Sequence, residues 1–254
     1  YKTVDGGATW SLQFQNQDPA GFDDCFAFWT PTRGLVMADS SGGRFPVLRT
    51  VDGQTWQDIG DHLPAALQGE SAFAASGTCV ATVGPRRAWI ATGGAERARV
   101  LATVDGGETW AAYDTPIPQG TASSGAFTVA FRDIRHGMLG GGDLAAPGDT
   151  SDNTARSRDG GKTWQLAAPT PFPGAIYGLA YALGRDHTHR DADGRDRDHV
   201  TVVATGPGGA AWSADEGDTW SLLPGVASYW AVGFASHRTG WLVGTEGRIL
   251  KIEL

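Results

Sequence analysis

Short apolar runs alternate with glycine-rich polar turns along the whole chain. Leu35-Val36-Met37-Ala38, Trp89-Ile90-Ala91 and Val200-Thr201-Val202-Val203-Ala204 are typical of these runs. Runs this short, rich in β-branched and aromatic residues and bounded by turn residues, indicate strands rather than helices. The pattern therefore predicts an all-β fold made of many short strands.

The runs recur as a unit of about 50 residues, and each unit carries the same polar turn. The first copy reads Thr3-Val4-Asp5-Gly6-Gly7-Ala8-Thr9-Trp10, so the pattern is Ser or Thr, any residue, Asp, glycine, and then Thr-Trp. Regular repetition at this period indicates a repeat architecture. The marker residues of the five copies are Asp5 and Trp10, Asp52 and Trp56, Asp105 and Trp110, Asp159 and Trp164, and Asp215 and Trp220.

The residue types of the repeated turn suit a structural role. An Asp carboxylate accepts hydrogen bonds from backbone N–H groups a few residues further on, and glycine allows positive φ. The Trp supplies a large apolar body for packing against a neighbouring element. Five equivalent catalytic Asp residues in one small domain would make no chemical sense, so we expect the five Asp residues to close turns.

These turns resemble the Asp-box, also called the bacterial neuraminidase repeat. The resemblance implies a β-propeller of four-stranded antiparallel blades, with each box on the turn between the third and fourth strands. It says little about activity, because sialidases, glucanases, sortilin-like receptors and photosystem assembly factors all carry the box.

Five blade repeats are visible, and we expect residues 1–254 to form a single propeller domain. The last repeat contains three strand-like runs, and residues 9–14 form a strand next to a box with no blade of their own. Pairing this strand with the last repeat would close the ring and leave no free edge. The alternative is that the chain is the later part of a six- or seven-blade ring. The expected inner strands are 24–29, 71–76, 126–131, 176–183 and 229–234.

Composition excludes some classes of protein. The formal net charge is −8, which argues against an electrostatic nucleic-acid interface, and no apolar run is long enough to span a membrane. Cys25 and Cys79 could bridge if their blades are adjacent, but the sequence favours two buried free thiols.

Polar residues that interrupt the inner strands or their loops are the candidate site residues. Asp39, Thr92 and Asp143 fall at matching points of their repeats, which predicts that they lie at one end of the ring. Carboxylates near arginines could bind a carboxylate or a peptide, or catalyse glycoside hydrolysis with Glu70, Asp39 and Asp143. The alternative is that these are ordinary polar loops and surface ion pairs. The ligand-binding candidates are Asp39, Arg44, Glu70, Arg99, Arg132 and Asp143.

The segment 184–199 is an insertion rich in His, Asp and Arg. His187, His189 and Asp191 are weak candidates for a metal site. Mixed charges, irregular spacing and the lack of an apolar anchor favour a solvated loop instead. We expect no cofactor, because the chain has no dinucleotide glycine fingerprint and no metal-ligand quartet.

Two families offer functional expectations. Sialidases share only the boxes: Arg44-Phe45-Pro46 is not their Arg-Ile-Pro motif, and no Tyr stands beside an obvious Glu partner. The chain more closely resembles bacterial relatives of the photosystem II stability and assembly factor family, in Glu70–Thr78, Gly93–Val100 and Ala126–Asp143. That resemblance implies a secreted or periplasmic, non-enzymatic scaffold for a protein partner. The alternative is a glycoside hydrolase, sialidase-like or otherwise, acting on a glycan.

Overall fold

Residues 1–19, 21–190 and 196–254 are described by a computed structural model, with the side chains of 184–199 outside the description. Two one-turn helices, η1 (Gly60–His62) and η2 (Thr245–Gly247), accompany the strands. The strands are β1 (Asp23–Thr30), β2 (Arg33–Ala38), β3 (Val47–Thr50), β4 (Gln57–Asp58), β5 (Val80–Val83), β6 (Arg87–Ala91), β7 (Arg99–Thr103), β8 (Ala111–Asp114), β9 (Ser124–Phe131), β10 (Gly137–Asp143), β11 (Thr154–Ser157), β12 (Gln165–Leu166), β13 (Gly178–Arg190), β14 (Asp196–Gly206), β15 (Gly209–Ser213), β16 (Ser221–Leu222), β17 (Tyr229–Phe234), β18 (Thr239–Gly244) and β19 (Ile249–Glu253).

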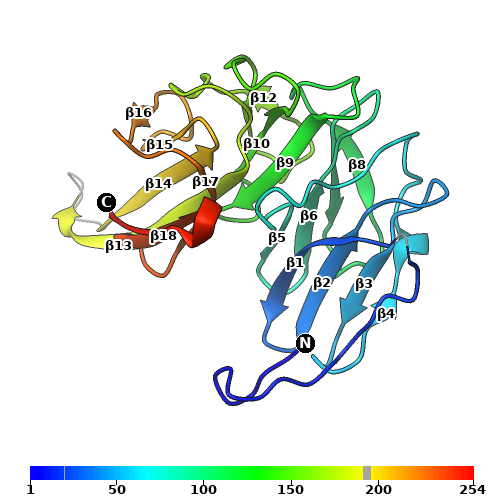
Figure 1. The fold of residues 1–254 in the computed structure, drawn as a ribbon. Helices are drawn as coiled ribbons and strands as arrows, with labels where there is room; N and C mark the ends of the chain where they lie inside the picture. Colours follow the sequence, from blue (N-terminus) through cyan, green and yellow to red (C-terminus); the bar gives the residue numbers. More distant parts are fainter. Residues whose placement is uncertain (20, 191–195) are drawn as a thin grey trace.

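The strands form five antiparallel sheets, which we number as blades one to five in chain order (Figure 1). Blades one to four have four strands each and blade five has β17, β18 and β19. In every blade the strands pair in the order in which they occur in the chain. The predicted all-β propeller of four-stranded antiparallel blades is confirmed. Among the described residues, each blade packs extensively on the next blade along the chain. No such extensive contact joins blade five to blade one.

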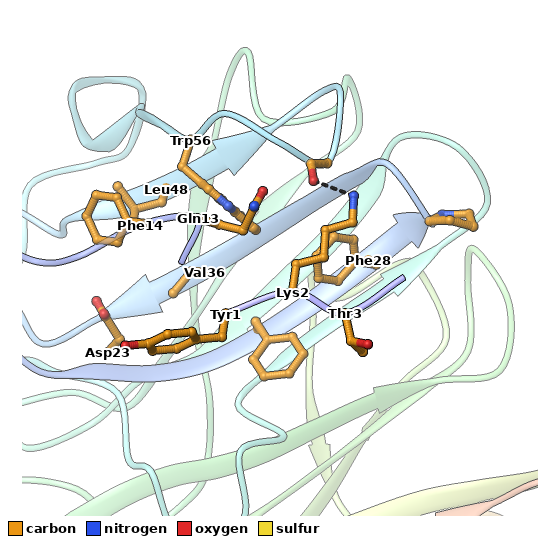
Figure 2. Close-up of a pocket in the computed structure, with 13 residues that line it drawn as sticks. Tyr1, Lys2, Thr3, Gln13, Phe14, Asp23, Phe28, Val36, Leu48 and Trp56 are labelled. Atoms are coloured by element: carbon orange, nitrogen blue, oxygen red, sulfur yellow. Dashed lines mark hydrogen bonds between the residues drawn. The ribbon is translucent and has the colours of Figure 1, made fainter. Parts of the chain in front are cut away.

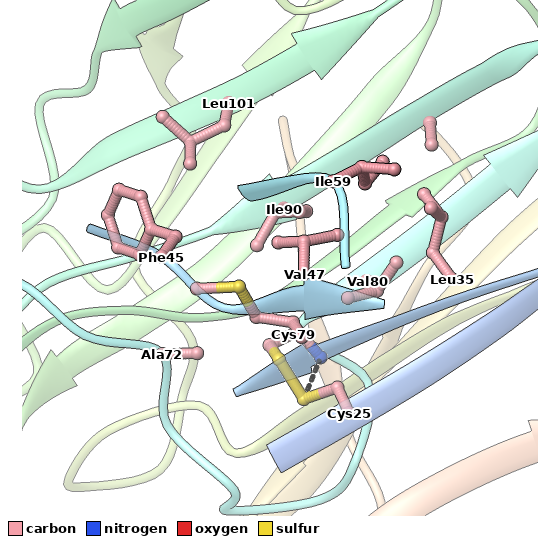
Figure 3. Close-up of a cluster of buried hydrophobic side chains, with 12 residues drawn as sticks. Cys25, Leu35, Phe45, Val47, Ile59, Ala72, Cys79, Val80, Ile90 and Leu101 are labelled. Carbon is pink, nitrogen blue, oxygen red and sulfur yellow. Dashed lines mark hydrogen bonds between the residues drawn. A yellow bond between two sulfur atoms is a disulfide. The ribbon is translucent and has the colours of Figure 1, made fainter. Parts of the chain in front are cut away.

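The interface between blades one and two, which we call the first seam, shows how alternation builds the core. One face of blade one packs on one face of blade two, and successive residues of each strand point to opposite faces. The buried residues of the first seam include Cys25, Leu35, Met37, Phe45 and Val47 from blade one, and Cys79, Val80, Ile90 and Leu101 from blade two (Figure 3).

The first seam also contains a disulfide. Cys25 of β1 and Cys79, the residue before β5, are bridged across a Cα–Cα distance of 5.8 Å. The expectation of two free thiols is therefore wrong. Both residues are buried, and the packing of adjacent inner strands brings their Cβ atoms within reach of each other.

All five boxes lie between a third and a fourth strand position and use the same hydrogen bonds. In the third box, Thr109 donates its N–H to Asp105 Oδ1 and its hydroxyl to Asp105 Oδ2, at 3.0 and 2.6 Å. The Gly107 N–H donates to Thr103 Oγ1 at 3.0 Å. In the first box, hydrogen bonds from the Thr9 side chain and backbone, with one from Thr3, lower the pKa of Asp5 to about 2. The five Asp residues therefore close turns as ionised acceptors.

The N-terminal segment repeats the pairing that a third and a fourth strand make on either side of a box. Lys2 and Ser11 exchange both backbone hydrogen bonds, in the register that pairs Arg49 with Gln57 inside blade one. The expected pairing of residues 9–14 with the last repeat does not occur in the described structure, where blade five has three strands. The physical reason is that Gln13 and Phe14 lie against the outer face of blade one. The prediction of a single domain over 1–254 stays a prediction.

Two strand boundaries also differ from expectation. Residues 71–76 form no inner strand; the strand begins at Val80, after a loop in which Gly69 and Gly77 adopt positive φ. In blade four the backbone of β13 and β14 extends well into the insertion, to Arg190 and from Asp196. The insertion therefore lengthens a hairpin.

Blades two and three approach each other unusually closely at their inner edge. Gly93 and Gly125 form an isolated antiparallel bridge between the two sheets. The Thr78 and Thr128 hydroxyls meet nearby at 2.7 Å, and the Ser76 hydroxyl donates to the Tyr177 carbonyl at 2.6 Å. Polar contacts of residues in or just before the inner strands thus connect blades two, three and four.

Candidate functional site

The predicted site residues lie at two opposite ends of the blades. Asp39 follows β2 and Asp143 ends β10, so both lie where the inner strands begin. Arg132 follows β9 at the other end, the end that carries the boxes. Arg132 therefore does not converge with Asp39 and Asp143.

Glu70 is fully buried, and both of its carboxylate oxygens accept hydrogen bonds. Its carboxylate forms a bidentate ion pair with Arg99 and accepts hydrogen bonds from the Thr92 hydroxyl at 2.6 Å and the Leu67 N–H at 2.8 Å. Arg99 also donates to the Ala65 carbonyl at 3.0 Å. A buried carboxylate with four donors cannot reach a substrate, so Glu70 and Arg99 fix the loop before blade two on β6 and β7.

Arg132 belongs to an ion pair between blades three and four. Its Nε lies 2.7 Å from Glu216 Oε1, in the fourth-blade box, and its Nη1 lies 3.0 Å from Asp133. The Tyr181 hydroxyl donates to the same Glu216 oxygen at 3.2 Å. Burial, with the adjacent Glu216 charge, raises the pKa of Tyr181 well above its usual value. Tyr181 therefore stays protonated as a donor.

Asp143 and Arg44 also have local partners. Asp143 accepts from the Ser123 hydroxyl at 2.7 Å and the Ala145 N–H at 2.9 Å, and these bonds lower its pKa. Arg44 forms ion pairs with Asp58 and Asp61 at 2.8 and 2.6 Å. Of the six predicted ligand-binding residues, only Asp39 and Arg44 share a described cleft.

Asp24 is a residue that the sequence reasoning missed. Burial, and then the charges of Asp39 and Asp23 with a hydrogen bond to Asp39, raise its pKa to about 7. The available signal was the Asp23-Asp24 doublet at the start of an otherwise apolar strand. Asp39 in turn lines a polar cleft of about 450 Å³ with Arg44, Asp58 and Ser41. Asp24 therefore keeps its proton to a higher pH than an ordinary Asp side chain does.

An apolar cleft lies on the face of blade one that points away from blade two, and we call it the blade-one cleft (Figure 2). Its volume is about 520 Å³. The sheet forms its floor, and the N-terminal segment runs across it, held by a 2.7 Å hydrogen bond from Lys2 Nζ to the Gly53 carbonyl. Its lining residues include Tyr1, Lys2, Thr3, Gln13, Phe14, Asp23, Phe26, Phe28, Val36, Leu48 and Trp56.

The blade-one cleft exposes aromatic rings to solvent. Phe26 is 66% exposed and Phe28 is 40% exposed. Phe28 packs edge-to-face against both Phe26 and Trp56, with ring centroids 6.2 and 5.9 Å apart. The rings are therefore ordered relative to one another before any ligand binds.

Other chemistry finds little support in the described part of the chain. No group of three His, Cys, Asp or Glu side chains there is placed to hold a metal ion. The candidates His187, His189 and Asp191 lie outside the residues whose side chains are described. No helix within the described ranges has the length and apolar character needed to cross a membrane.

A sequence model of the BNR/Asp-box repeat matches residues 155–166, which span β11, the fourth box and β12. The chain is an Asp-box β-propeller. A comparison with curated protein sequences gives no match.

Three solved structures illustrate the likeness of this Asp-box propeller to known proteins. An ancestral enzyme of glycoside hydrolase family 74 is 13% identical over 90% of this chain and 30% of that chain, with a TM-score of 0.58. YCF48 bound to D1 peptide is 16% identical over 91% of each chain, with a TM-score of 0.41. The Hadza microbial sialidase Hz136 is 14% identical over 91% of this chain and 52% of that chain, with a TM-score of 0.49. The likeness to the family 74 enzyme, at 13% identity, shows the fold alone.

Proposed function

We propose that this propeller is a non-enzymatic binding module for a polypeptide partner, with the blade-one cleft as its binding surface. The observation that carries the proposal is the group of packed rings of Phe26, Phe28 and Trp56, of which Phe26 and Phe28 are exposed to solvent. Contiguous exposed apolar surface marks interaction sites on soluble proteins, and aromatic anchors dominate the energetics of protein interfaces.

The state of the predicted carboxylates supports binding over catalysis. Glycoside hydrolysis requires two accessible carboxyl groups about 5–10 Å apart across a substrate. Glu70 is buried in an ion pair, and Asp143 is held by Ser123 and Ala145. Glu70 therefore cannot reach a substrate, and the lowered pKa of Asp143 makes it a poor proton donor to a glycosidic oxygen.

The resemblance to photosystem II assembly factors implies the same kind of function, and we propose a secreted or periplasmic location for this chain. The disulfide between Cys25 and Cys79 supports this location, since disulfides persist mainly in oxidising compartments.

A second candidate function, glycoside hydrolysis, is favoured by one observation. The raised pKa of Asp24 provides a carboxyl group that is protonated near neutral pH beside Asp39. A general acid needs this property, although the direct hydrogen bond between the two groups leaves no room for a sugar between them.

Selection from a displayed library of random peptides tests the proposal. We expect enrichment of peptides with apolar side chains that bind the wild-type chain and lose at least tenfold in affinity on Phe26→Glu. Ile134→Glu is the matched control, because Ile134 is 48% exposed on blade three, outside the cleft. No Phe26-dependent peptide, together with hydrolysis of any member of a glycan panel that Asp24→Asn abolishes, would replace binding by the second candidate.

A further inference from the structure

We propose that the end of blades one to three that carries the boxes binds to an anionic lipid bilayer. We call this end the box-end surface. It is formed by the boxes of the three blades and by the turns between their first and second strands. The inference goes beyond peptide binding at the blade-one cleft and rests on other residues.

Basic side chains without an acidic partner gather on the box-end surface. Arg49 is paired with Glu108, and Arg132 is paired with Glu216. Six other basic side chains at this end form no ion pair within the described part of the chain. They are Arg33, Arg86, Arg87, Arg135, Arg158 and Lys162.

The two ends of blades one to three differ in charge. On the box-end surface the basic side chains outnumber the carboxylates, which are those of Asp52, Asp105, Glu108, Asp133 and Asp159. At the opposite end the arginines are Arg44, Arg97 and Arg99, and each is paired with a carboxylate. The chain as a whole has a formal net charge of −8. A negatively charged surface would therefore attract and orient the chain by its box end.

The boxes also present apolar side chains to solvent at this end. In the third box the Thr103 hydroxyl donates to Asp105 Oδ1 at 2.8 Å, so these two side chains face each other. The side chain between them points away from the blade, and Val104 is 57% exposed. In the fourth box the same position holds the exposed Arg158. The box fold thus displays whichever residue stands at this position.

The turns between first and second strands display residues in the same way. In blade three, Asp133 Oδ1 accepts the Arg135 N–H at 2.7 Å, and the turn leaves Ile134 and Arg135 exposed. In blade two the corresponding turn exposes Pro85 and Arg86. Apolar and basic side chains therefore alternate on the box-end surface.

The three blades form one continuous surface at this end. Arg33 Nη1 of blade one donates to the Pro85 carbonyl of blade two at 3.5 Å. Trp89 Nε1 of blade two donates to the Gly160 carbonyl of the fourth box, in blade three, at 2.8 Å. Blades two and three each pack against a neighbouring blade on both faces, so the exposure of their ends does not come from an uncovered blade face.

An anionic bilayer uses both kinds of side chain. Each Arg or Lys close to such a surface contributes about a fivefold gain in affinity. Apolar side chains gain further when they enter the boundary between headgroups and acyl chains. An acidic polypeptide or a nucleic acid would use the charges and leave Val104 and Ile134 in water. The combination of side chains therefore favours a lipid surface.

The first test measures binding of the full chain to vesicles by co-sedimentation. We expect binding at low ionic strength to vesicles of equal parts phosphatidylglycerol and phosphatidylcholine, and none to phosphatidylcholine alone. The double substitution Arg86→Glu and Arg135→Glu should reduce binding at least tenfold. The matched control is Arg248→Glu with Lys251→Glu, which changes the net charge equally on exposed residues of blade five and should reduce binding less than threefold. Equal losses in the two double variants would show an effect of net charge alone and overturn the inference.

The second test separates a bilayer from other polyanions. Val104→Ser with Ile134→Ser should reduce vesicle binding at least fivefold, because two apolar side chains no longer enter the lipid. Ile249→Ser is the control, since Ile249 is 71% exposed on blade five, and should change binding less than twofold. Binding of polyglutamate that depends on Arg86 and Arg135, without binding to vesicles, would show that the partner is an acidic polypeptide and that the inference is wrong.

The outcomes also separate this inference from the proposed function. Phe26→Glu should remove peptide binding at the blade-one cleft and leave vesicle binding within threefold. If vesicles bind and no Phe26-dependent peptide is found, the box-end inference stands and the proposed function fails. If the chain binds neither vesicle composition, the box-end inference is wrong whatever the result with peptides.

Discussion

The first seam and the blade-one cleft present the same strand face in two environments. Ile90 is fully buried at the seam, whereas Val36, its counterpart one blade earlier, is half-buried beside open space. Both are branched aliphatic residues at the same register position. The comparison shows that burial here depends on the strands that cover a face, and that residue type alone does not report it.

The largest expected difference concerns the disulfide, which only the first seam contains. The double substitution Cys25→Ala and Cys79→Ala should lower the free energy of unfolding by about 4 kcal/mol, because the bridge closes a loop with a sequence separation of 54. Urea unfolding monitored by Trp fluorescence measures the change. Addition of a reductant to the wild-type chain is the control, and an unchanged midpoint in both experiments would contradict the prediction.

Truncation on the two faces should have unequal costs. Ile90→Ala should destabilise the chain by about 3 kcal/mol, through lost apolar burial and a residual cavity. Val36→Ala should cost less than about 1 kcal/mol, because the side chain is only half-buried. Equal costs in urea unfolding would show that the cleft is covered in solution.

A substitution of Glu70, which pairs with Arg99, distinguishes a structural role of this carboxylate from a catalytic one. Glu70→Gln should lower the free energy of unfolding by about 2 kcal/mol, because Arg99 would lose its charged partner in a buried site. Peptide binding at the blade-one cleft should stay within twofold of the wild type. A variant of unchanged stability that loses a glycan-hydrolysing activity would point to catalysis instead.

A further expected effect is a pH dependence of the free energy of unfolding that comes from Asp24. Its folded-state pKa is about 7, above the usual value of about 3.9 in an unfolded chain. Between these values the unfolded chain releases a proton that the folded chain keeps, so this group makes stability fall as pH rises from about 4 to 7. Asp24→Asn should remove that part of the slope when unfolding is measured at pH 5 and pH 8. A difference between variant and wild type that does not change with pH would contradict the raised pKa.

Local chemistry determined how much of the fold was predictable. The boxes predicted blade number, turn position and the role of Asp105, because their hydrogen bonds join residues within a few positions of one another. The inner strand of blade two was misplaced, because the loop before Val80 is as apolar as a strand and differs mainly at Gly69 and Gly77.

The candidate site was less predictable because its contacts are distant in sequence. Glu70 meets Arg99, Arg132 meets Glu216 and Cys25 meets Cys79, each through the packing of separate strands or blades. A polar residue in a loop does not reveal which partner will neutralise it. Arg132 follows β9 and Asp143 ends β10, and these two strands run in opposite directions. The strand order alone therefore predicts that the two residues lie at opposite ends of the blade.

The bridge between Gly93 and Gly125 limits which substitutions the propeller can accept. A β-carbon built on either residue would lie within about 2.5 Å of the other's Cα, closer than side-chain carbons pack. The obstacle is main chain, which cannot rotate away as a side chain would. Even an alanine at one of these two positions would push blades two and three apart. Substitutions that the exposed loops tolerate would therefore not be tolerated at Gly93 or Gly125.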